Sequence, residues 1–152
     1  MSGNGSDATL FEESFNVTNF DQSKYDRVAR ISATSSDEST ILTLDINVEL
    51  IQLGIGQNMT VMIATSLALD GSKSEEKGWR DTSKGNQPAE PTLADMYDYV
   101  CYGKIYKFED GDDGKNIKVY ASFGGLLLSL NGPYKKLTSL RVDYIYLLVK
   151  RQ

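Results

Sequence analysis

The sequence predicts an all-β protein that folds as a small antiparallel barrel, and three stretches carry this prediction. Over 42–50, apolar residues alternate with polar ones, the period of two expected of a strand with one buried face. The stretch 96–108 is a second strand, dense in tyrosine. Over 120–132, an alternating segment runs into Gly124-Gly125 and leaves as another apolar run. Glycine inside a strand pattern indicates a bulge, a bend or the close approach of another backbone. We therefore expect one kinked strand at Gly124-Gly125 to serve two walls and close the barrel.

The other strands follow in order. The strand 61–65 is expected to return against 42–50 as a hairpin. The last strand, 144–149, is apolar on both sides, so another element or a partner is expected to cover it. The expected strands are 10–17, 25–33, 42–50, 61–65, 96–108, 116–123, 126–130 and 144–149. Turns are expected at 19–23, 35–39 and 54–58, a hairpin tip at 109–114, and short helical turns at 92–95 and 133–140.

The 152 residues suit one domain. Residues 1–8 are expected to form a flexible tail, and 9–152 a single β-barrel domain. Within it, 70–92 is too polar to bury much apolar surface, so we expect a long loop that is either functional or disordered. Trp79, the large apolar residue of this loop, has three interpretations: it packs the loop onto the barrel, it contacts a partner, or it is exposed.

The composition argues against catalysis and against a metal site. The chain has no histidine and a single cysteine, Cys101, so it lacks the usual general base, the commonest metal ligand and a cysteine-based zinc site. No catalytic residue, metal or cofactor is predicted. The net charge of −5 disfavours a stand-alone nucleic-acid binder, because phosphate neutralisation supplies most of such affinity. No apolar run approaches the roughly 20 residues that span a bilayer, and the N-terminus lacks the features of a signal peptide.

Asp45 and Glu49 could lie on one face of the strand 42–50. Paired carboxylates serve acid–base chemistry when a cleft raises the pKa of one of them. Here they occupy the face that should be polar and solvated, and this is the placement we expect. Ser122 and Cys101 lack a base and are not predicted to be nucleophiles.

An aromatic set interleaved with lysines has three interpretations. It is a barrel wall with hydroxyl groups in water, a protein interface, or a platform on which nucleotide bases stack. The set comprises Tyr97, Tyr99, Tyr102, Tyr106, Phe108 and Tyr120, with Lys104, Lys107 and Lys118.

Several strings resemble the eighth subunit common to the eukaryotic nuclear RNA polymerases I, II and III. The resemblance covers about 11–151, with the strings in the same order as in that family. The most specific are Tyr102-Gly103 followed by Tyr106-Lys-Phe108-Glu109, and Ser122-Phe-Gly-Gly-Leu-Leu127. The others are Leu42-Thr-Leu-Asp-Ile-Asn-Val-Glu-Leu50, Leu93-Ala-Asp-Met-Tyr-Asp-Tyr-Val100 and Tyr146-Leu-Leu-Val149. The segment 70–92 and the turn 54–58 do not align with the family.

The resemblance implies an eight- or nine-stranded antiparallel barrel related to the oligonucleotide-binding fold, with a long Ω-type loop. It implies a non-catalytic subunit of the nucleus, and of the nucleolus through polymerase I. This subunit docks on the largest polymerase subunit and supports assembly. No membrane association, homo-oligomer or direct nucleic-acid contact is expected. The competing hypotheses are a free single-stranded nucleic-acid-binding module and an enzyme using the carboxylates. On the subunit hypothesis, the predicted docking residues are Tyr99, Tyr102, Lys104, Tyr106, Ser122, Phe123, Gly124, Gly125 and Leu126.

Overall fold

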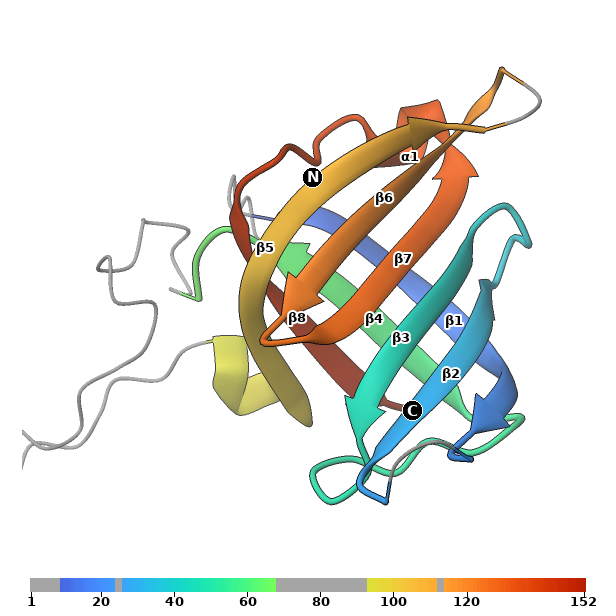
Figure 1. The fold of residues 1–152 in the computed structure, drawn as a ribbon, viewed down its shortest axis with the longest axis vertical. Helices are drawn as coiled ribbons and strands as arrows, with labels where there is room; N and C mark the ends of the chain where they lie inside the picture. The colour runs from blue at the N-terminus through green and yellow to red at the C-terminus, as the bar shows by residue number, and fades with distance from the viewer. Residues whose placement is uncertain (1–8, 24–25, 68–92, 112–113) are drawn as a thin grey trace, which may run out of the picture.

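The structure, a computed structural model, describes residues 9–23, 26–67, 93–111 and 114–152. The predicted antiparallel barrel is confirmed: eight strands close in the order β1-β2-β3-β7-β6-β5-β8-β4 (Figure 1). The strands are β1 Thr9–Asp21, β2 Val28–Ser35, β3 Ile41–Asn47, β4 Asn58–Ala64, β5 Tyr99–Asp110, β6 Asn116–Phe123, β7 Leu126–Pro133 and β8 Tyr144–Arg151. The predicted helical turns correspond to η1, Leu93–Met96, and α1, Tyr134–Leu137. The predicted tail 1–8 and the whole of the predicted loop 70–92, with Trp79, lie outside the described residues.

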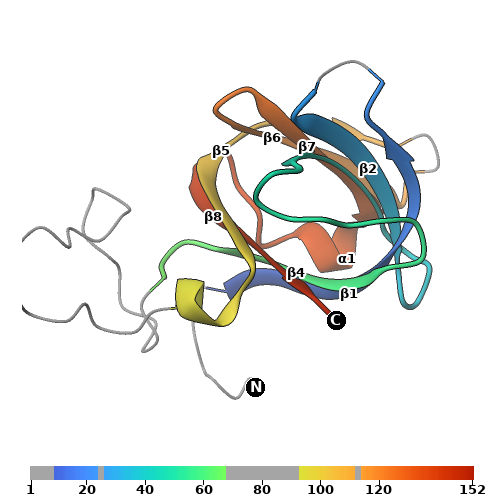
Figure 2. The ribbon, with the colours of Figure 1, turned by 90° about the horizontal axis from the view of Figure 1, so that it is seen from below.

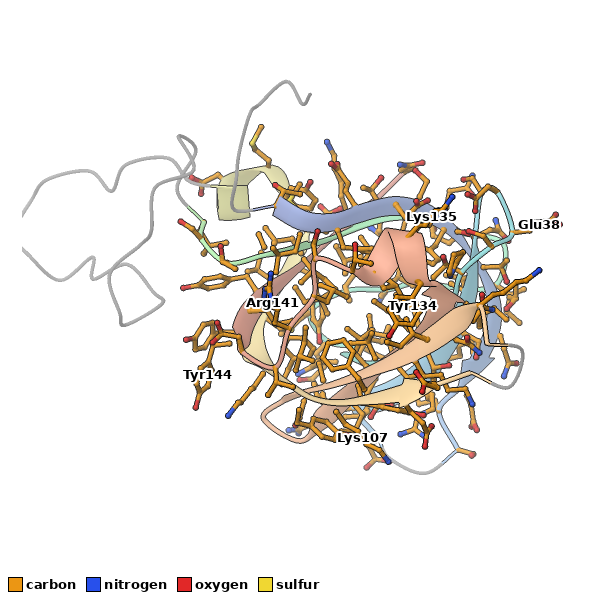
Figure 3. All side chains as sticks on the ribbon, turned by 90° about the horizontal axis from the view of Figure 1, so that it is seen from above. Glu38, Lys107, Tyr134, Lys135, Arg141 and Tyr144 are labelled. Atoms are coloured by element: carbon orange, nitrogen blue, oxygen red, sulfur yellow. The ribbon has the colours of Figure 1, made fainter. Side chains whose placement is uncertain are left out.

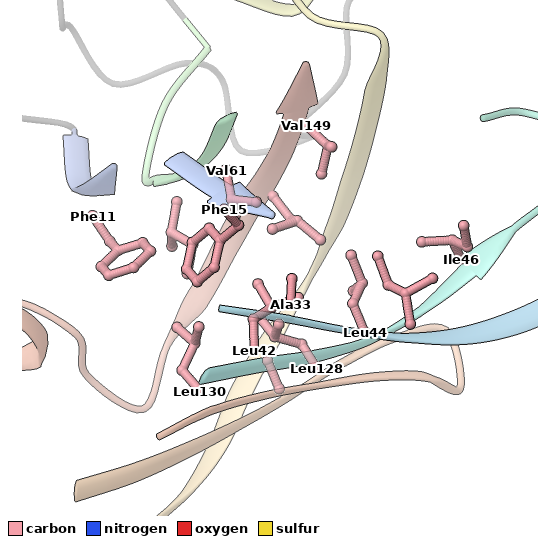
Figure 4. Packing of buried hydrophobic residues seen from close by; sticks show 14 of the residues in the cluster. Phe11, Phe15, Ala33, Leu42, Leu44, Ile46, Val61, Leu128, Leu130 and Val149 are labelled. Atoms are coloured by element: carbon pink, nitrogen blue, oxygen red, sulfur yellow. The ribbon is translucent and has the colours of Figure 1, made fainter. Parts of the chain in front are cut away.

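The inner faces of the strands form one apolar core (Figure 4). In β3 the predicted alternation holds for Leu42, Leu44 and Ile46, which are all buried. It fails for Leu50, which is 67% exposed. The reason is local: the Asn47 side-chain oxygen accepts a hydrogen bond from the Glu49 N–H at 2.9 Å, an Asx-type turn that ends the strand.

The predicted hairpin between 42–50 and 61–65 is wrong. β3 pairs with β2 and β7, whereas β4 pairs with β1 and β8. Residues 48–57 cross the end of the barrel instead (Figure 2), where Ile51 and Leu53 are buried. The alternating pattern predicts which residues of a strand face inward, but it does not predict which strands pair with each other.

Two further boundaries differ. β1 continues through the predicted turn at 19–23 as far as Asp21, past a bulge between Val17 and Asn19. β2 begins at Val28, three residues later than expected. Pairing between these strands extends to Asp21 opposite Arg30, so the tertiary ladder overrides the local turn preference of the polar residues.

Gly124-Gly125 is a tight hairpin turn and not a kink in one continuous strand. Phe123 pairs with Leu126, and the two glycines have φ angles of 67° and 98°. Two consecutive residues with positive φ form the primed turn that matches the twist of a hairpin. A Cβ on either glycine would meet nothing within 4 Å, so glycine is favoured here by backbone conformation and not by space.

The kinked strand that serves two walls does exist, but it is β5. β5 pairs with β8 over residues 99–104 and with β6 from Lys104 onward. A Cβ on Gly103 would collide with the carbonyl oxygen of Ser122 and lie 2.9 Å from the Cα of Phe123. Glycine therefore lets β6 approach β5 where β5 changes partners.

β8 is covered on both faces, as expected. Its inward residues join the main core, and Tyr146 and Leu148 form a second apolar cluster on the outside of the barrel with Met62, Ala64 and Leu67. Tyr97 and Val100 pack against this outer cluster. Among the described residues, no helix is long and apolar enough to cross a membrane.

Candidate docking surface

The structure divides the predicted docking residues into three places. Tyr102, Lys104 and Tyr106 project from the outside of β5, and Ser122 lies opposite Lys104 on β6. Gly124, Gly125 and Leu126 form the β6–β7 turn and the start of β7. The side chains of Tyr99 and Phe123 are buried, at 4% and 6% exposure, and belong to the core.

The outer wall carries a set of tyrosines and lysines that we call the tyrosine face: exposed Tyr102, Lys104, Tyr106, Lys107 and Tyr144, and half-buried Tyr120. The ring of Tyr102 stacks on Tyr144 with centroids 5.8 Å apart and planes 12° apart, and it lies 4.8 Å from the ring of Tyr146. The Lys104 Nζ lies 5.2 Å from the Tyr144 ring centroid. Tyr144 projects away from the barrel (Figure 3) and is 54% exposed.

The second half of the tyrosine face lies where β5 bulges. Tyr106 is the extra residue, because Ile105 pairs with Ala121 and Lys107 with Tyr120. The ring of Tyr106 lies 6.4 Å from that of Tyr120, and the Lys107 Nζ lies 5.5 Å from the Tyr120 centroid. The bulge thus turns two consecutive side chains outward.

Glu109 adds a negative charge at the edge of this group. Its Oε1 accepts a hydrogen bond from the Tyr120 hydroxyl at 3.0 Å, and its Oε2 lies 3.8 Å from the Lys107 Nζ. The bond to Glu109, with a smaller contribution from burial, raises the pKa of Tyr120. Tyr120 therefore stays a neutral phenol through the physiological range.

Tyr144 was missed by the sequence analysis. It belongs to the tyrosine face because β8 lies beside β5, where Tyr144 pairs with Lys104 and Tyr146 with Tyr102. Its strand was recognised as apolar on both sides. The one available signal was the spacing of two between Tyr144 and Tyr146, which places both on the same side of β8.

The turn between β6 and β7 is anchored by polar contacts. The Gly125 N–H donates to the Ser122 Oγ at 3.2 Å, and the Leu127 N–H donates to the Asp45 Oδ2 at 3.0 Å. Arg30 donates to both Asp45 oxygens, at 2.7 and 3.2 Å. Asp45 is only 8% exposed, so the expected solvated placement is wrong for this residue. Its carboxylate ties β2, β3 and β7 together.

Glu49 and Cys101 were also considered for catalysis. Glu49 pairs with Arg27 at 3.3 Å, beyond the end of β3, with both side chains mostly exposed. Burial raises the pKa of the Cys101 thiol, so this group is protonated at neutral pH. Within the described ranges, no group of three or more His, Cys, Asp or Glu residues could hold a metal ion.

Comparison with known proteins identifies the family of this chain. The model of the family RNA polymerase Rpb8 matches residues 12–151. DNA-directed RNA polymerases I, II, and III subunit RPABC3 of Saccharomyces cerevisiae is 42% identical over 148 residues, covering 94% of this chain and 98% of that protein. The proteins of that name from Dictyostelium discoideum and Schizosaccharomyces pombe are 41% and 36% identical, covering 93% and 96% of this chain and 96% and 99% of their own lengths. The chain therefore belongs to the RNA polymerase Rpb8 family.

Proposed function

We propose that this protein is a non-catalytic subunit shared by the nuclear DNA-directed RNA polymerases I, II and III, and that it docks on the largest subunit and supports assembly. Near full-length similarity to proteins named as shared polymerase subunits supports the role. A subunit of these enzymes works in the nucleus, and sharing with polymerase I extends this location to the nucleolus.

The single observation that carries the docking surface is the exposed stack of Tyr102 and Tyr144, at 45% and 54% exposure, beside Lys104. Tyrosine supplies large, rigid, amphipathic contact area, and aromatic residues are enriched at interface hot spots. The β6–β7 turn lies next to this stack, because Ser122 is opposite Lys104. We propose that the docking surface comprises the outer predicted residues Tyr102, Lys104, Tyr106, Ser122, Gly124, Gly125 and Leu126, with Tyr144 added. Tyr99 and Phe123 support it from inside.

The role is tested by purifying the epitope-tagged chain from its native cells and measuring the largest polymerase subunit by quantitative mass spectrometry. Stoichiometric recovery is expected. Absence of the largest subunit from the purified material would overturn the proposal.

The surface is tested with Tyr102→Ala and Lys104→Glu. Truncation at an interface hot spot costs about 2 kcal/mol or more, roughly a thirtyfold loss of affinity. Lys135→Glu, on α1, is the matched control, because it makes the same charge change on a different exposed element. Unchanged recovery with both face variants would refute the placement.

A free single-stranded nucleic-acid-binding module is the second candidate, favoured by the same pairing of exposed tyrosines with lysines. It predicts oligonucleotide binding that weakens with added salt and with Tyr102→Ala. The net charge of −5 and the ion pair of Lys107 with Glu109 both oppose it. Absence of binding at low salt would remove this candidate.

A further inference from the structure

The barrel wall has a notch between β3 and β5. The β6–β7 hairpin fills the space between these strands, but its turn ends before they do (Figure 1). The ladder of β7 with β3 covers residues 41–44, and that of β6 with β5 covers 104–110. Within the described part of the chain, residues 45–47 of β3 and 99–103 of β5 therefore have no strand beside them on the sides that face each other.

The β3 side of the notch is occupied by side-chain contacts. The Asn47 N–H donates to the Tyr99 hydroxyl at 3.1 Å, so the donor at the end of β3 is used. The Asp45 carboxylate binds Arg30 and the Leu127 N–H. β3 consequently offers little to an additional strand.

The β5 side is different. In an antiparallel ladder, successive residues direct their backbone groups to opposite edges. The Ile105 N–H donates to the Asp143 carbonyl, in the same register as the β5–β8 ladder, which directs the backbone groups of the odd-numbered residues of β5 toward β8. The N–H and C=O groups of Val100 and Tyr102 therefore face the notch.

This edge is flanked by positive charge and by aromatic surface. Lys104 follows Tyr102 on the same outer face of β5, and its Nζ lies 5.2 Å from the Tyr144 ring centroid. Alternating backbone donors and acceptors are complementary to an extended polypeptide, which binds a sheet edge through its main chain and gains specificity from alternate side chains. Charge complementarity with Lys104 favours acidic side chains on the outward face of that segment.

We propose that the edge of β5 at Val100 and Tyr102 accepts an extended acidic segment of another polymerase subunit by strand addition. This inference rests on the proposed function and deepens it. It names the mode of contact, the backbone groups that make it and the chemistry of the partner segment.

Hydrogen exchange of the unmodified protein tests the mode directly. In the isolated chain, the amides of Val100 and Tyr102 should exchange quickly, while the β8-facing amides of Cys101 and Gly103 exchange slowly. In the purified polymerase, exchange over 99–104 should slow at least tenfold at the two notch-facing positions. Equal exchange over 99–104 in the free and assembled protein would overturn strand addition while leaving subunit membership intact.

A proline variant tests the same edge. Val100→Pro removes an N–H that faces the notch and leaves the β8 ladder in place, since proline is tolerated at a strand edge. Val142→Pro is the matched control, because Val142 is exposed in the connection between α1 and β8, outside every strand. We expect at least a tenfold loss of polymerase recovery for Val100→Pro relative to this control, provided that its thermal unfolding remains cooperative. Equal recovery of the two variants would contradict the proposal.

A photo-crosslinking amino acid in place of Tyr102 identifies the occupant. The expected product is a crosslink to an acidic segment of another polymerase subunit, and Lys104→Glu should reduce its yield, more strongly at low salt. A crosslink to nucleic acid, or to a basic or helical segment, would overturn the assignment. If the tagged wild-type chain recovers no polymerase at all, the proposed function itself fails, which is a different result from each of these.

Discussion

The hydroxyl group of Tyr99 accepts a hydrogen bond from the backbone N–H of Asn47 at 3.1 Å, and this contact joins β5 to β3 across a part of the wall where no ladder connects them. Tyr99 is 4% exposed and packs in the main core. The Tyr99 side chain thus connects two strands that elsewhere in the barrel would be connected through a neighbouring strand.

Tyr99→Phe keeps the ring and removes this contact. A part-buried N–H then loses its partner, so the free energy of unfolding should fall by about 1 kcal/mol. Chemical denaturation at neutral pH measures the change. Tyr134→Phe, which removes the hydroxyl group from a half-exposed tyrosine on α1, is the control and should stay near the wild-type value.

The wild type and Tyr99→Phe should also differ at alkaline pH. Burial, and then the neighbouring Cys101, raise the pKa of Tyr99 well above its ordinary value of 10.0. Above about pH 10 the unfolded chain releases this proton while the folded protein retains it, so the Tyr99 contribution to stability is present below pH 10 and is lost as pH rises. The free energy of unfolding of the wild type should therefore decline more steeply between pH 10 and pH 12 than that of Tyr99→Phe. Parallel pH profiles would show that Tyr99 ionises normally.

Asp45→Ala should be strongly destabilising. It removes a nearly buried carboxylate that binds Arg30 and the Leu127 N–H, and hydrogen bonds to charged groups each contribute about 1.5–3 kcal/mol. We expect a loss of about 2 kcal/mol or more in the free energy of unfolding. Glu49→Ala is the control: its ion pair with Arg27 is exposed, so the change should stay under about 1 kcal/mol. Similar losses for the two variants would indicate that Asp45 is solvated in solution.

Gly103→Ala should disrupt the place where β5 changes partners. The added methyl group would meet backbone atoms of Ser122 and Phe123, which cannot move aside without breaking the β5–β6 ladder. Overpacking of this kind costs about 1–3 kcal/mol, or more where backbone must shift. In Gly54→Ala the new Cβ meets nothing within 4 Å, so this variant should have near wild-type thermal stability. A stable Gly103→Ala protein would mean that β5 bends differently.

Acid should weaken the connection between α1 and the β2–β3 turn. Lys136, then Ser35 and Ser39, hold the pKa of Asp37 well below its ordinary value of 3.8 through hydrogen bonds to the carboxylate. The stabilisation is present above about pH 4 and is lost as pH falls through the lowered pKa of Asp37, because the unfolded chain takes up the proton first. The difference in melting temperature between wild type and Asp37→Asn should be largest near neutral pH and shrink below pH 4. Lys136 also pairs with Glu13 at 2.9 Å, so Glu13→Gln should also lower the melting temperature.

Local chemistry was enough to predict several elements. The alternation of Leu42, Leu44 and Ile46 and the apolar strand 144–149 depend on side chains that are adjacent in the chain. The all-β class and the single barrel followed from such patterns. Tyr102, Lys104 and Tyr106 were placed on one strand for the same reason.

Other features depended on which strands meet. The hairpin expected between 42–50 and 61–65 was wrong, because a period of two describes the faces of a strand and is the same whichever strand lies beside it. Tyr144 joined the tyrosine face through the pairing of β8 with β5, which has long sequence separation. Asp45 was expected in solvent, but contacts with Arg30 and with the Leu127 N–H after the β6–β7 turn bury its carboxylate.

The sequence by itself determined a closed apolar interior, a polar exterior and glycines at the positions where the backbone must turn or approach closely. Only the tertiary structure decided that Gly103 is the corner and Gly124-Gly125 a hairpin turn, because a glycine's role depends on what its missing side chain would meet. It likewise decided that the wall between β3 and β5 is bridged by Tyr99. Where the β6–β7 hairpin ends relative to β3 and β5 is defined only when these strands lie side by side in the barrel.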